Sequence, residues 1–562
     1  MRRVVGWLAA ALPVLLLVVV PLALFVATAP KGMHEAWSAP GEAARSLRLL
    51  LRTVLLAGGT GLGALALGLP AGLLLSRTDL PGRAAAAALS VVPLALPPYM
   101  HAIAWIDLMG RQGLVNRLIA ALGGSPQATV SVFGNPAARN PSEAVFPSGA
   151  VWILSLALWP VAAGMVAATA VLVDPHQEDA ARLEGGERAA VARVILPLVA
   201  PAALLALALV GLLCLAEFGV PGLLNVPVYP EQIYVDFGLS YRPELAAAHA
   251  LPLLAVGGLA LAAVLALARR LPQGVQTEEF GSRRLIRLGR WRGPAAAFVG
   301  LLLLLSVVAP VADIAWWAGG LGQYRTALVA GSDQLLSSLQ FSVVATVAAV
   351  LVAVVVLAAG RGLRRSPSRT GAGQRPRPTA PRCSGWGLAA WLLLLPAALP
   401  GSVLAIGFIR AGREARIGNG GMLLAACLTA IVVPAALVGL WAALRSVDPE
   451  LEECAALDGA SALRRWVSVI LPLARPGLLT GAAIAFILAM RELPATILLY
   501  PPGKETAAAM IFSQMHYGFI GDVAAMCVLT TLLTVGLVGV GAMVGLGRRR
   551  RPHPPAPSGV SC

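Results

Sequence analysis

The sequence predicts an all-α polytopic membrane protein, with about twelve transmembrane helices in two parallel six-helix repeats. Three observations indicate this class: low charge, long apolar runs and an internal repeat. Of the 562 residues, 58% are hydrophobic and only 12% are charged, and the mean hydropathy is +0.79. Because soluble globular proteins have about 25% charged residues, this chain has too little charge to cover a surface that faces water.

The expected spans follow from the apolar runs. A helix needs about 20 mostly apolar residues to cross the ~30 Å hydrocarbon layer. Such runs occur at 5–28, 53–75, 84–107, 149–172, 198–223, 246–268, 294–317, 338–359, 385–409, 421–444, 476–499 and 521–546. We interpret the first as a retained helix, because it is long for a signal peptide and lacks a convincing cleavage site.

The basic residues predict the orientation. The chain has 43 Lys and Arg against 27 Asp and Glu, a net charge of +16 that suits either nucleic acid or one face of a membrane. If the N-terminus is cytoplasmic, about two thirds of the basic residues fall on the cytoplasmic side, although Arg410, Arg413 and Arg416 lie on a predicted outer loop. The positive-inside rule therefore places both termini in the cytoplasm. The basic runs adjoin spans and lack interleaved aromatics, so we expect no nucleic-acid partner.

An internal repeat divides the chain. Segment Val173–Gly185 recurs as Val447–Gly459, and seven of the thirteen positions are identical. Each copy continues to Val-Ile-Leu-Pro-Leu, and Pro93-Leu-Ala-Leu-Pro97 resembles Pro396-Ala-Ala-Leu-Pro400. Because each half has an even number of spans, the repeats share one orientation.

The repeat sets the expected domains. They are a first repeat at 1–268 with its core at 50–268, a cytoplasmic linker at 269–293, a second repeat at 294–546 with its core at 335–546, and a basic cytoplasmic tail at 547–562. The Arg-rich stretch 360–385 is expected to be a disordered cytoplasmic loop.

Each repeated segment has the pattern of a docking element on a predicted cytoplasmic loop. Asp-Pro suits a turn into a helix, acidic residues in the first turn favour the helix dipole, and small residues then precede a glycine that can end or bend the helix. The acidic residues of the two segments stand out on this otherwise basic side: Glu178, Asp179, Glu184, Glu187, Glu450, Glu452, Glu453 and Asp458.

The pattern resembles the EAA loop of binding-protein-dependent ABC transporter permeases, which reads Glu-Ala-Ala, three residues, Gly, and then Ile-x-Leu-Pro. It departs from that pattern where Asp179 replaces Glu and Cys454 replaces the first Ala, and the first copy has one residue fewer before Leu-Pro. The resemblance assigns these residues to loops that couple to an ATPase: Glu178, Asp179, Ala180, Ala181, Gly185, Leu196 and Pro197, and Glu452, Glu453, Ala455, Gly459, Leu471 and Pro472.

The resemblance implies a fold like that of type I ABC importer permeases, with one polypeptide doing the work of two subunits in the bacterial cytoplasmic (inner) membrane. The implied partners are two copies of a nucleotide-binding ATPase subunit, a periplasmic substrate-binding protein and the lipid bilayer. The chain itself has no phosphate loop, since Gly503-Lys504-Glu505 lacks the upstream glycine and the hydroxyl. We therefore expect no enzyme activity or cofactor in this chain, with ATP and Mg²⁺ on the partner ATPase.

Three further stretches narrow the resemblance. Glu217–Pro221, Arg491–Thr496 and Tyr500–Thr506 resemble the fused permeases of ferric-iron importers, whose relatives move thiamine or phosphonates. Charges inside spans are costly and are functional candidates by default. Glu217, Arg491 and Glu492 are thus expected either to line or gate the pathway, or to lock helices together by ion pairing. No cluster of metal ligands is visible, so no metal site is expected.

Two other classes are weighed. A secondary transporter of two parallel six-helix halves would explain the spans and the Arg-rich central loop, but not a pair of EAA-like loops at equivalent positions. A membrane scaffold without transport activity would explain the composition alone. The leading hypothesis is the permease subunit of an ATP-driven importer, with ferric iron as the expected substrate.

Overall fold

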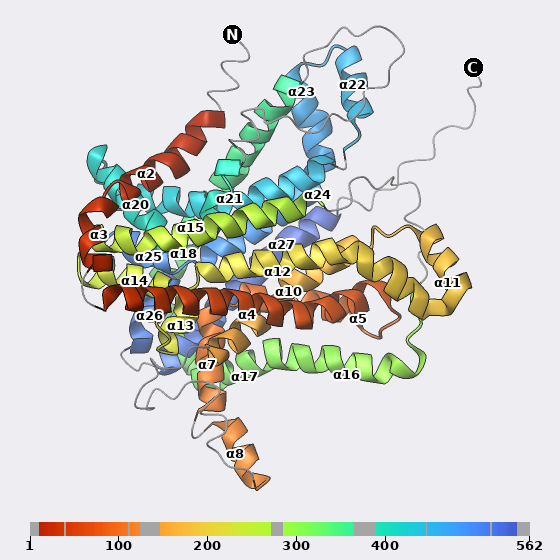
Figure 1. Cartoon of the computed structure of the whole chain (residues 1–562), viewed down its shortest axis with the longest axis horizontal. Helices are drawn as coiled ribbons and strands as arrows, with labels where there is room; N and C mark the ends of the chain where they lie inside the picture. The colour runs from red at the N-terminus through yellow and green to blue at the C-terminus, as the bar shows by residue number, and fades with distance from the viewer. Residues whose placement is uncertain are drawn as a thin grey trace.

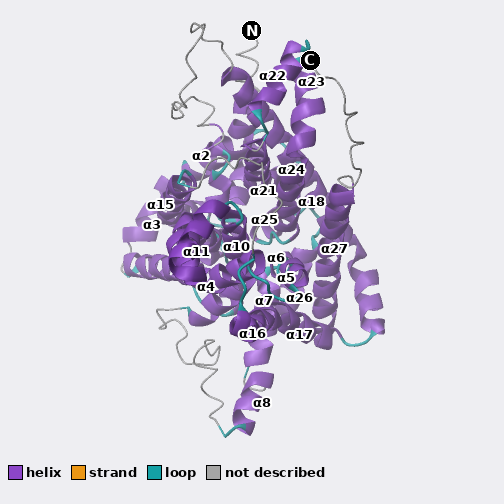
Figure 2. Ribbon diagram, turned by 90° about the vertical axis from the view of Figure 1, so that its right-hand side faces the viewer, coloured by secondary structure: helices purple, strands orange, loops and turns teal. Residues whose placement is uncertain are grey.

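The computed structural model describes residues 10–38, 41–110, 113–123, 147–270, 285–364, 389, 391–445, 447–516 and 520–547. These residues are almost entirely helical (Figures 1 and 2), and among them the β-type pairing is a single parallel bridge between Thr78 and Ile286. Five expectations fall wholly or partly outside the described residues: the start of the first span, linker residues 271–284, most of the basic loop at 360–385, the start of the span 385–409, and the tail after 547.

Nine helices in the described part of the chain are long and apolar enough to cross a membrane, and two bent helix pairs raise this number to as many as eleven. The all-α polytopic class is therefore confirmed, with a count close to the twelve expected. The nine are Glu42–Arg77, Ser148–Ala170, Pro175–Leu215, Pro243–Ala268, Gly289–Ala318, Leu321–Gly360, Gly420–Arg445, Ala462–Met490 and Gly521–Gly541.

The first half contains α2 (Val20–Val26), α3 (Ala29–Ser38), α4 (Glu42–Arg77), α5 (Arg83–Leu89), α6 (Val92–Ala95), α7 (Pro98–Met109), α8 (Leu114–Ala121), α10 (Ser148–Ala170), α11 (Pro175–Ala189), η3 (Ala190–Ile195), α12 (Leu196–Leu215), α13 (Gly219–Leu223), α14 (Tyr229–Tyr234), η4 (Val235–Leu239) and α15 (Pro243–Ala268). A π-helical turn, η1 (Leu15–Val19), precedes α2.

The second half repeats this order with η6 (Gly289–Trp291), α16 (Arg292–Leu303), η7 (Leu304–Val308), α17 (Ala309–Ala318), α18 (Leu321–Arg364), η8 (Leu395–Ala398), α20 (Gly401–Glu414), α21 (Gly420–Arg445), α22 (Pro449–Leu457), α23 (Ala462–Arg465), η9 (Trp466–Ile470), α24 (Leu471–Met490), α25 (Pro494–Leu499), α26 (Ala507–His516) and α27 (Ile520–Gly547).

The expected spans 84–107 and 385–409 are not straight helices. The first is bent by 96° between Arg83–Ala95 and Pro98–Ala121. In the second, η8 and α20 are separated by extended residues, and the start of the span lies outside the described residues. Both breaks fall at the repeated proline pattern, where Pro97 and Pro400 have nearly identical extended dihedrals, φ −56° with ψ 140° and 139°. Proline lacks an N–H and disfavours helix in the residue before it, so the chain turns at these points.

Each half packs around its own long helix. In the first half α4 lies against α10 and α12, and in the second half α18 lies against α21 and α24. The two main apolar clusters follow this division, one around Leu56 and Trp159 and the other around Leu428 and Leu440. The two packings are equivalent, as the repeated sequence predicts.

The two halves contact each other through helices near the start of each half. α2 of the first half packs on α20 of the second, while α17 of the second half packs on α7 of the first. The close approach of α2 and α20 occurs at Gly407, where a Cβ atom would collide with the carbonyl of Pro21. Neither half is therefore a separate body.

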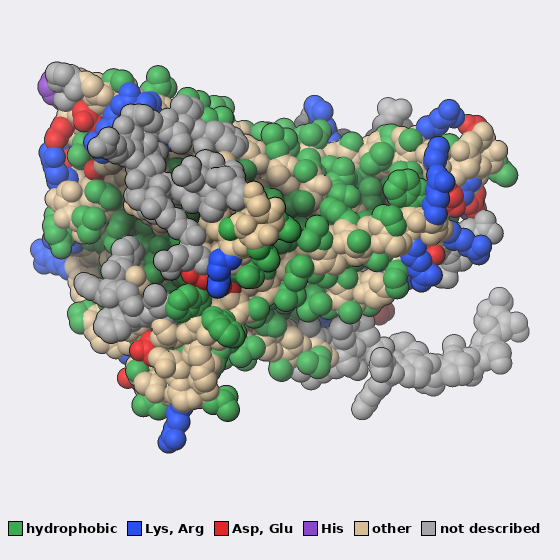
Figure 3. All heavy atoms as spheres, turned by 90° about the horizontal axis from the view of Figure 1, so that it is seen from below, with side chains coloured by type: hydrophobic (Ala, Val, Ile, Leu, Met, Phe, Trp, Pro, Cys, Tyr) green, Lys and Arg blue, Asp and Glu red, His purple; other side chains and the backbone are tan. Residues whose placement is uncertain are grey.

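The surface suits a bilayer. Figure 3 shows hydrophobic side chains over most of one face, with charged side chains gathered mainly toward its two ends. In Figure 1 the long helices run from left to right, α11 lies at the right-hand end, and α22 and α23 lie toward the upper right. The two repeated segments thus lie toward one end of the helix bundle, called the α11 end below.

Candidate functional site

Both repeated segments begin as their sequence predicts. Asp174 caps α11 by accepting a hydrogen bond from the His176 N–H at 2.9 Å, and Asp448 caps α22 by accepting one from the Glu450 N–H at 2.9 Å. A proline follows at the first helical position in each case, where its missing N–H costs nothing.

Glycines interrupt both helices. Within α11, Gly185 leaves the helical region and Gly186 has φ +71°, and beyond the end of α22, Gly459 has φ +79°. Glycine adopts positive φ at no steric cost, unlike other residues. The left-handed residue of the first copy is thus Gly186, one position after the glycine that the motif identifies.

The motif prolines begin the next long helices. Leu196 and Pro197 are the first two residues of α12, and Leu471 and Pro472 are the first two of α24. A π-helical turn precedes each, in which the Leu196 N–H donates to the Val191 carbonyl and the Leu471 N–H to that of Trp466. Proline blocks the regular bond to the carbonyl four residues earlier, so the widened turn matches its position.

Glu178 and Glu452 are two of the acidic residues that stand out on the otherwise basic side, and both are buried, with 2% and 6% of their surface exposed. Glu178 forms ion pairs with Arg77, at the end of α4, and with Arg182, at 3.2 Å. Glu452 lies 4.0 Å from Arg465. A buried carboxylate needs such partners, so these two residues hold their helices to the bundle.

Other residues of the two segments remain on the surface. Asp179, Ala180 and Glu453 are exposed, while Ala181 and Ala455 are half-buried. A signal not used in the sequence analysis lies in the same repeat: Leu183 is 91% exposed and its counterpart Leu457 is 87% exposed. Each segment thus presents one leucine that is almost fully exposed.

Glu217 and Glu492 lie at equivalent breaks, where α12 and α24 end and short helices follow. Glu217 Oε1 accepts hydrogen bonds from the N–H groups of Gly219 at 3.0 Å and Val220 at 3.3 Å. Glu492 Oε1 accepts one from the Ala495 N–H at 3.2 Å. Both carboxylates therefore cap the short helix that follows them, α13 or α25.

Arg491 joins the two halves. Its guanidinium donates to the Leu94 carbonyl of the first half at 3.4 Å, and it interacts electrostatically with both Glu217 and Glu492. The three charges predicted from the sequence are thus brought together at the junction of the halves, although Arg491 bonds to a backbone carbonyl and not directly to either carboxylate.

An apolar contact closes this junction. Phe218 and Leu493, the residues that follow the two glutamates, are 4% and 3% exposed and belong to one cluster drawn from both halves. The Phe218 ring lies 5.3 Å from that of Tyr234 and 5.8 Å from that of Phe512. The sequence motifs did not single out these residues, although the repeat places Phe218 and Leu493 at equivalent positions.

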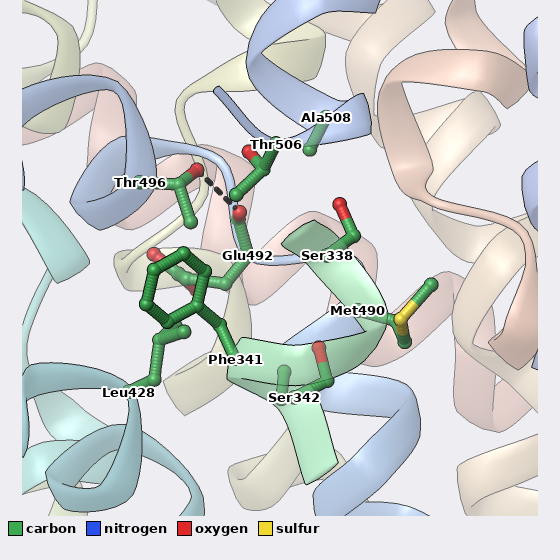
Figure 4. Close-up of a pocket in the computed structure, with 10 residues that line it drawn as sticks. Ser338, Phe341, Ser342, Leu428, Met490, Glu492, Thr496, Thr506 and Ala508 are labelled. Carbon is green, nitrogen blue, oxygen red and sulfur yellow. Dashed lines mark hydrogen bonds between the residues drawn. The ribbon is translucent and has the colours of Figure 1, made fainter. Parts of the chain in front are cut away.

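A small pocket adjoins Glu492 (Figure 4). It lies among α18, α21, α24, α25 and α26. Four hydroxyl residues line it together with Glu492: Ser338, Ser342, Thr496 and Thr506. Ser338 accepts a hydrogen bond from the Ala507 N–H at 2.8 Å. In the first half, Thr53 does the same for the Tyr229 N–H at 3.0 Å, so this helix connection is repeated.

Comparison with known proteins identifies one part of the chain. Residues 334–552 match the family described as "Binding-protein-dependent transport system inner membrane component". This range runs from α18 to beyond α27 and includes α22, Arg491 and Glu492.

Three relatives illustrate the similarity. A Salmonella paratyphi A permease protein, PhnV, whose name assigns it to 2-aminoethylphosphonate transport, is 30% identical over 153 residues, which are 26% of this chain and 58% of PhnV. The putrescine transport system permease protein PotI of Escherichia coli K12 is 31% identical over 17% of this chain and 34% of its own. The trehalose/maltose transport system permease protein MalF of Thermococcus litoralis is 32% identical over 20% and 39%.

The chain thus spans only part of the length of these relatives: 58% of PhnV, 34% of PotI and 39% of MalF. They agree with the family match in naming permease proteins of transport systems. Residues 334–552 of this chain are therefore similar to the binding-protein-dependent transport system inner membrane component family.

Proposed function

We propose that the chain is the membrane permease subunit of an ATP-driven ABC importer and does the work of two permease subunits. The observation that carries this proposal is the pair of short capped helices, α11 and α22. Each begins at Asp-Pro, ends or breaks at a glycine in positive φ, and leads into a long apolar helix through a π-helical turn. A secondary transporter of two six-helix halves would not explain two such helices at one end.

The partners follow from these helices. We propose that α11 and α22 each dock into one copy of a nucleotide-binding ATPase subunit, which binds ATP and Mg²⁺, while this chain has no ATPase activity. Leu183 and Leu457 supply an apolar anchor, and Asp179 and Glu453 supply charge beside it. Protein interfaces typically have an apolar core within a polar, solvent-accessible rim.

The proposed topology follows from these docking roles. The α11 end faces the cytoplasm of a bacterium, both termini lie on that side of the inner membrane, and the opposite end accepts substrate from a periplasmic binding protein. The positive-inside distribution of arginine supports this orientation.

The central junction is the proposed gate. Phe218 and Leu493 close the apolar contact between the halves, while Glu217, Arg491 and Glu492 hold the surrounding short helices and the α6 carbonyl in place. ATP-driven movement of α11 and α22 would separate the halves at this contact.

Ferric iron is the proposed substrate, on the resemblance carried by the stretches around Glu217, Arg491 and Tyr500. A phosphonate is the second candidate, because the PhnV match shares 30% identity over 153 residues. The described residues contain no group of three or more His, Cys, Asp or Glu that could hold a metal. We propose that the binding protein selects the substrate in either case.

The test is co-purification followed by uptake. The wild-type chain should co-purify with an ATPase subunit encoded beside it, and Leu183→Asp with Leu457→Asp should weaken that association at least tenfold, as loss of interface anchors does. Leu239→Asp changes an exposed leucine that follows α14 and is the matched control. Failure of any ATPase to bind the wild type would refute the proposal.

Uptake of radiolabelled ferric iron and of 2-aminoethylphosphonate, each measured with its binding protein, distinguishes the two candidate substrates.

A further inference from the structure

The linker between the halves returns to the first half before α16 begins. The Ile286 N–H donates to the Arg77 carbonyl at 2.8 Å, and the Asp79 N–H donates to the Ile286 carbonyl at 3.2 Å. The Leu288 N–H donates to Asp79 Oδ1 at 3.0 Å. Residues 285–288, called the linker strap below, are thus attached by three hydrogen bonds to the end of α4 and the loop that follows it.

A side chain strengthens this attachment. Ile286 is partly buried and packs against the apolar cluster formed where α10 ends and α12 begins. These two ends flank α11 along the chain, so the cluster packs where α11 joins the bundle. Its buried members are Val166, Ala170, Val173, Ile195, Val199 and Ala203.

Arg77 connects the linker strap to α11 directly. Its carbonyl accepts the hydrogen bond from Ile286, while its guanidinium pairs with Glu178 and donates to the Ala170 carbonyl at 3.3 Å. Arg77 and Glu178 are 3% and 2% exposed. A buried, hydrogen-bonded ion pair is costly to break because each partner would be left uncompensated. The linker strap, the end of α4 and α11 are therefore held as one unit.

The linker strap also leads without slack into the second half. Only the turn η6 separates it from α16, and the Trp291 N–H donates to the Leu288 carbonyl at 2.9 Å. α16 packs on α4 and α5, and its continuation α17 packs on α7 of the first half and α27 of the second. Movement of the linker strap would thus pull on the leading helix of the second half.

We propose that the linker strap is a positioning element for coupling: it fixes α11 to the end of α4 and transmits the movement of α11 to α16. This rests on the proposed function, in which a partner ATPase moves α11. Transmission through a continuous chain of hydrogen bonds and packed side chains is the physical form that such coupling takes. Movement of α11 would then reach α16 through the linker strap.

The first experiment tests the attachment by hydrogen exchange on the full chain in detergent. Ile286→Pro removes the N–H that binds the Arg77 carbonyl, and should speed exchange in residues 77–79 and in α11 by about tenfold, as loss of one hydrogen bond does. Arg287→Ala, which alters an exposed neighbour, is the control and should leave exchange unchanged. Equal exchange in the two variants would overturn the proposed attachment.

A second variant covers the case in which the proline variant fails to fold. Asp79→Ala removes only the acceptor of the Leu288 N–H. It should produce a smaller increase in exchange over the same residues, and wild-type exchange there would count against the attachment as well.

The second experiment tests transmission. A four-residue Gly-Ser insertion between Leu288 and Gly289 leaves the linker strap attached but adds slack before α16. Exchange in α11 should stay as in the wild type, while ATP hydrolysis by the complex with its ATPase and binding protein in proteoliposomes should fall at least about fivefold, the lower range of allosteric coupling. Unchanged hydrolysis would overturn the proposed transmission from α11 to α16.

If no ATPase binds the wild-type chain, the proposed function and the proposed transmission both fail. The exchange experiment still decides whether the linker strap is attached.

Discussion

At the scale of single residues, the two central glutamates show why a charge is retained beside apolar spans. Glu217 and Glu492 each follow the end of a long helix, at a point where the N–H groups of the next short helix need acceptors. In a bilayer no water can satisfy such groups, and each one left unpaired costs free energy. Helix capping is thus a third role, beyond the gating and ion pairing weighed from the sequence, and it is compatible with a gate.

This role predicts a difference between two substitutions of Glu492. Glu492→Gln keeps an oxygen that can accept from the Ala495 N–H and should unfold at nearly the wild-type temperature. Glu492→Ala leaves that N–H unpaired and should lose about 1–3 kcal/mol of stability. Thermal unfolding in detergent, followed by tryptophan fluorescence, measures both. Equal loss in the two variants would show that charge, not capping, is what stabilises this site.

Glu231 predicts a pH dependence. It lies on α14, between spans, its Oε2 atom makes no hydrogen bond, and burial raises the pKa of its carboxyl from 4.5 to about 7, against the smaller effect of a bond from the Val228 N–H. Because the pKa is higher in the folded protein, the folded state binds more protons between these values, and stability falls as pH rises from 4.5 to 7.

Glu231→Gln should remove this dependence. The wild type is expected to lose up to about 3 kcal/mol relative to the variant between pH 4.5 and pH 8, from 1.36 kcal/mol for each pKa unit. Unfolding temperatures of both proteins across this pH range test it, and parallel curves for the two proteins would contradict it.

At the scale of elements, glycines interrupt α11 and end α22. Gly459 has φ +79°, which costs a residue with a Cβ about 1–2 kcal/mol. Gly459→Ala should therefore displace the end of α22 with Leu457, and weaken ATPase binding by about tenfold. Gly418→Ala, at a glycine with open space around it and no positive φ, is the control. Pull-down of the ATPase against salt-washed membranes measures the change, and equal binding by both variants would argue against docking at Leu457.

The sequence predicted most elements because a bilayer leaves few alternatives to helices, and long apolar runs mark them. It also located the Asp-Pro starts of α11 and α22, since these signals are local. It did not predict the breaks inside spans 84–107 and 385–409, because hydropathy measures how apolar a run is and not its direction. The pairing of Arg77 with Glu178 joins residues 101 positions apart, so only the folded chain reveals it.

At the scale of the whole molecule, the two halves are joined by exchanged helices as well as by the linker. α2 packs on α20, α17 packs on α7, and Arg491 bonds to the Leu94 carbonyl across the junction. The apolar cluster around Phe218 and Leu493 adds a shared core. In lipid, close packing and interhelical hydrogen bonds are the forces that hold helices together, and all of them cross between the halves here.

Assembly of the halves should therefore survive a cut in the linker. Co-expressed fragments 1–276 and 277–562 keep the linker strap on the second fragment and are expected to co-purify as one complex in mild detergent.

Gly407→Leu in the second fragment places a side chain against the Pro21 carbonyl, and should weaken assembly by separating α2 from α20. Gly418→Leu is the matched control, because that glycine has open space around it. Size-exclusion chromatography with a tag on one fragment gives the result. Separate elution of the unsubstituted fragments would mean that the covalent linker, and not the exchanged helices, holds the molecule together.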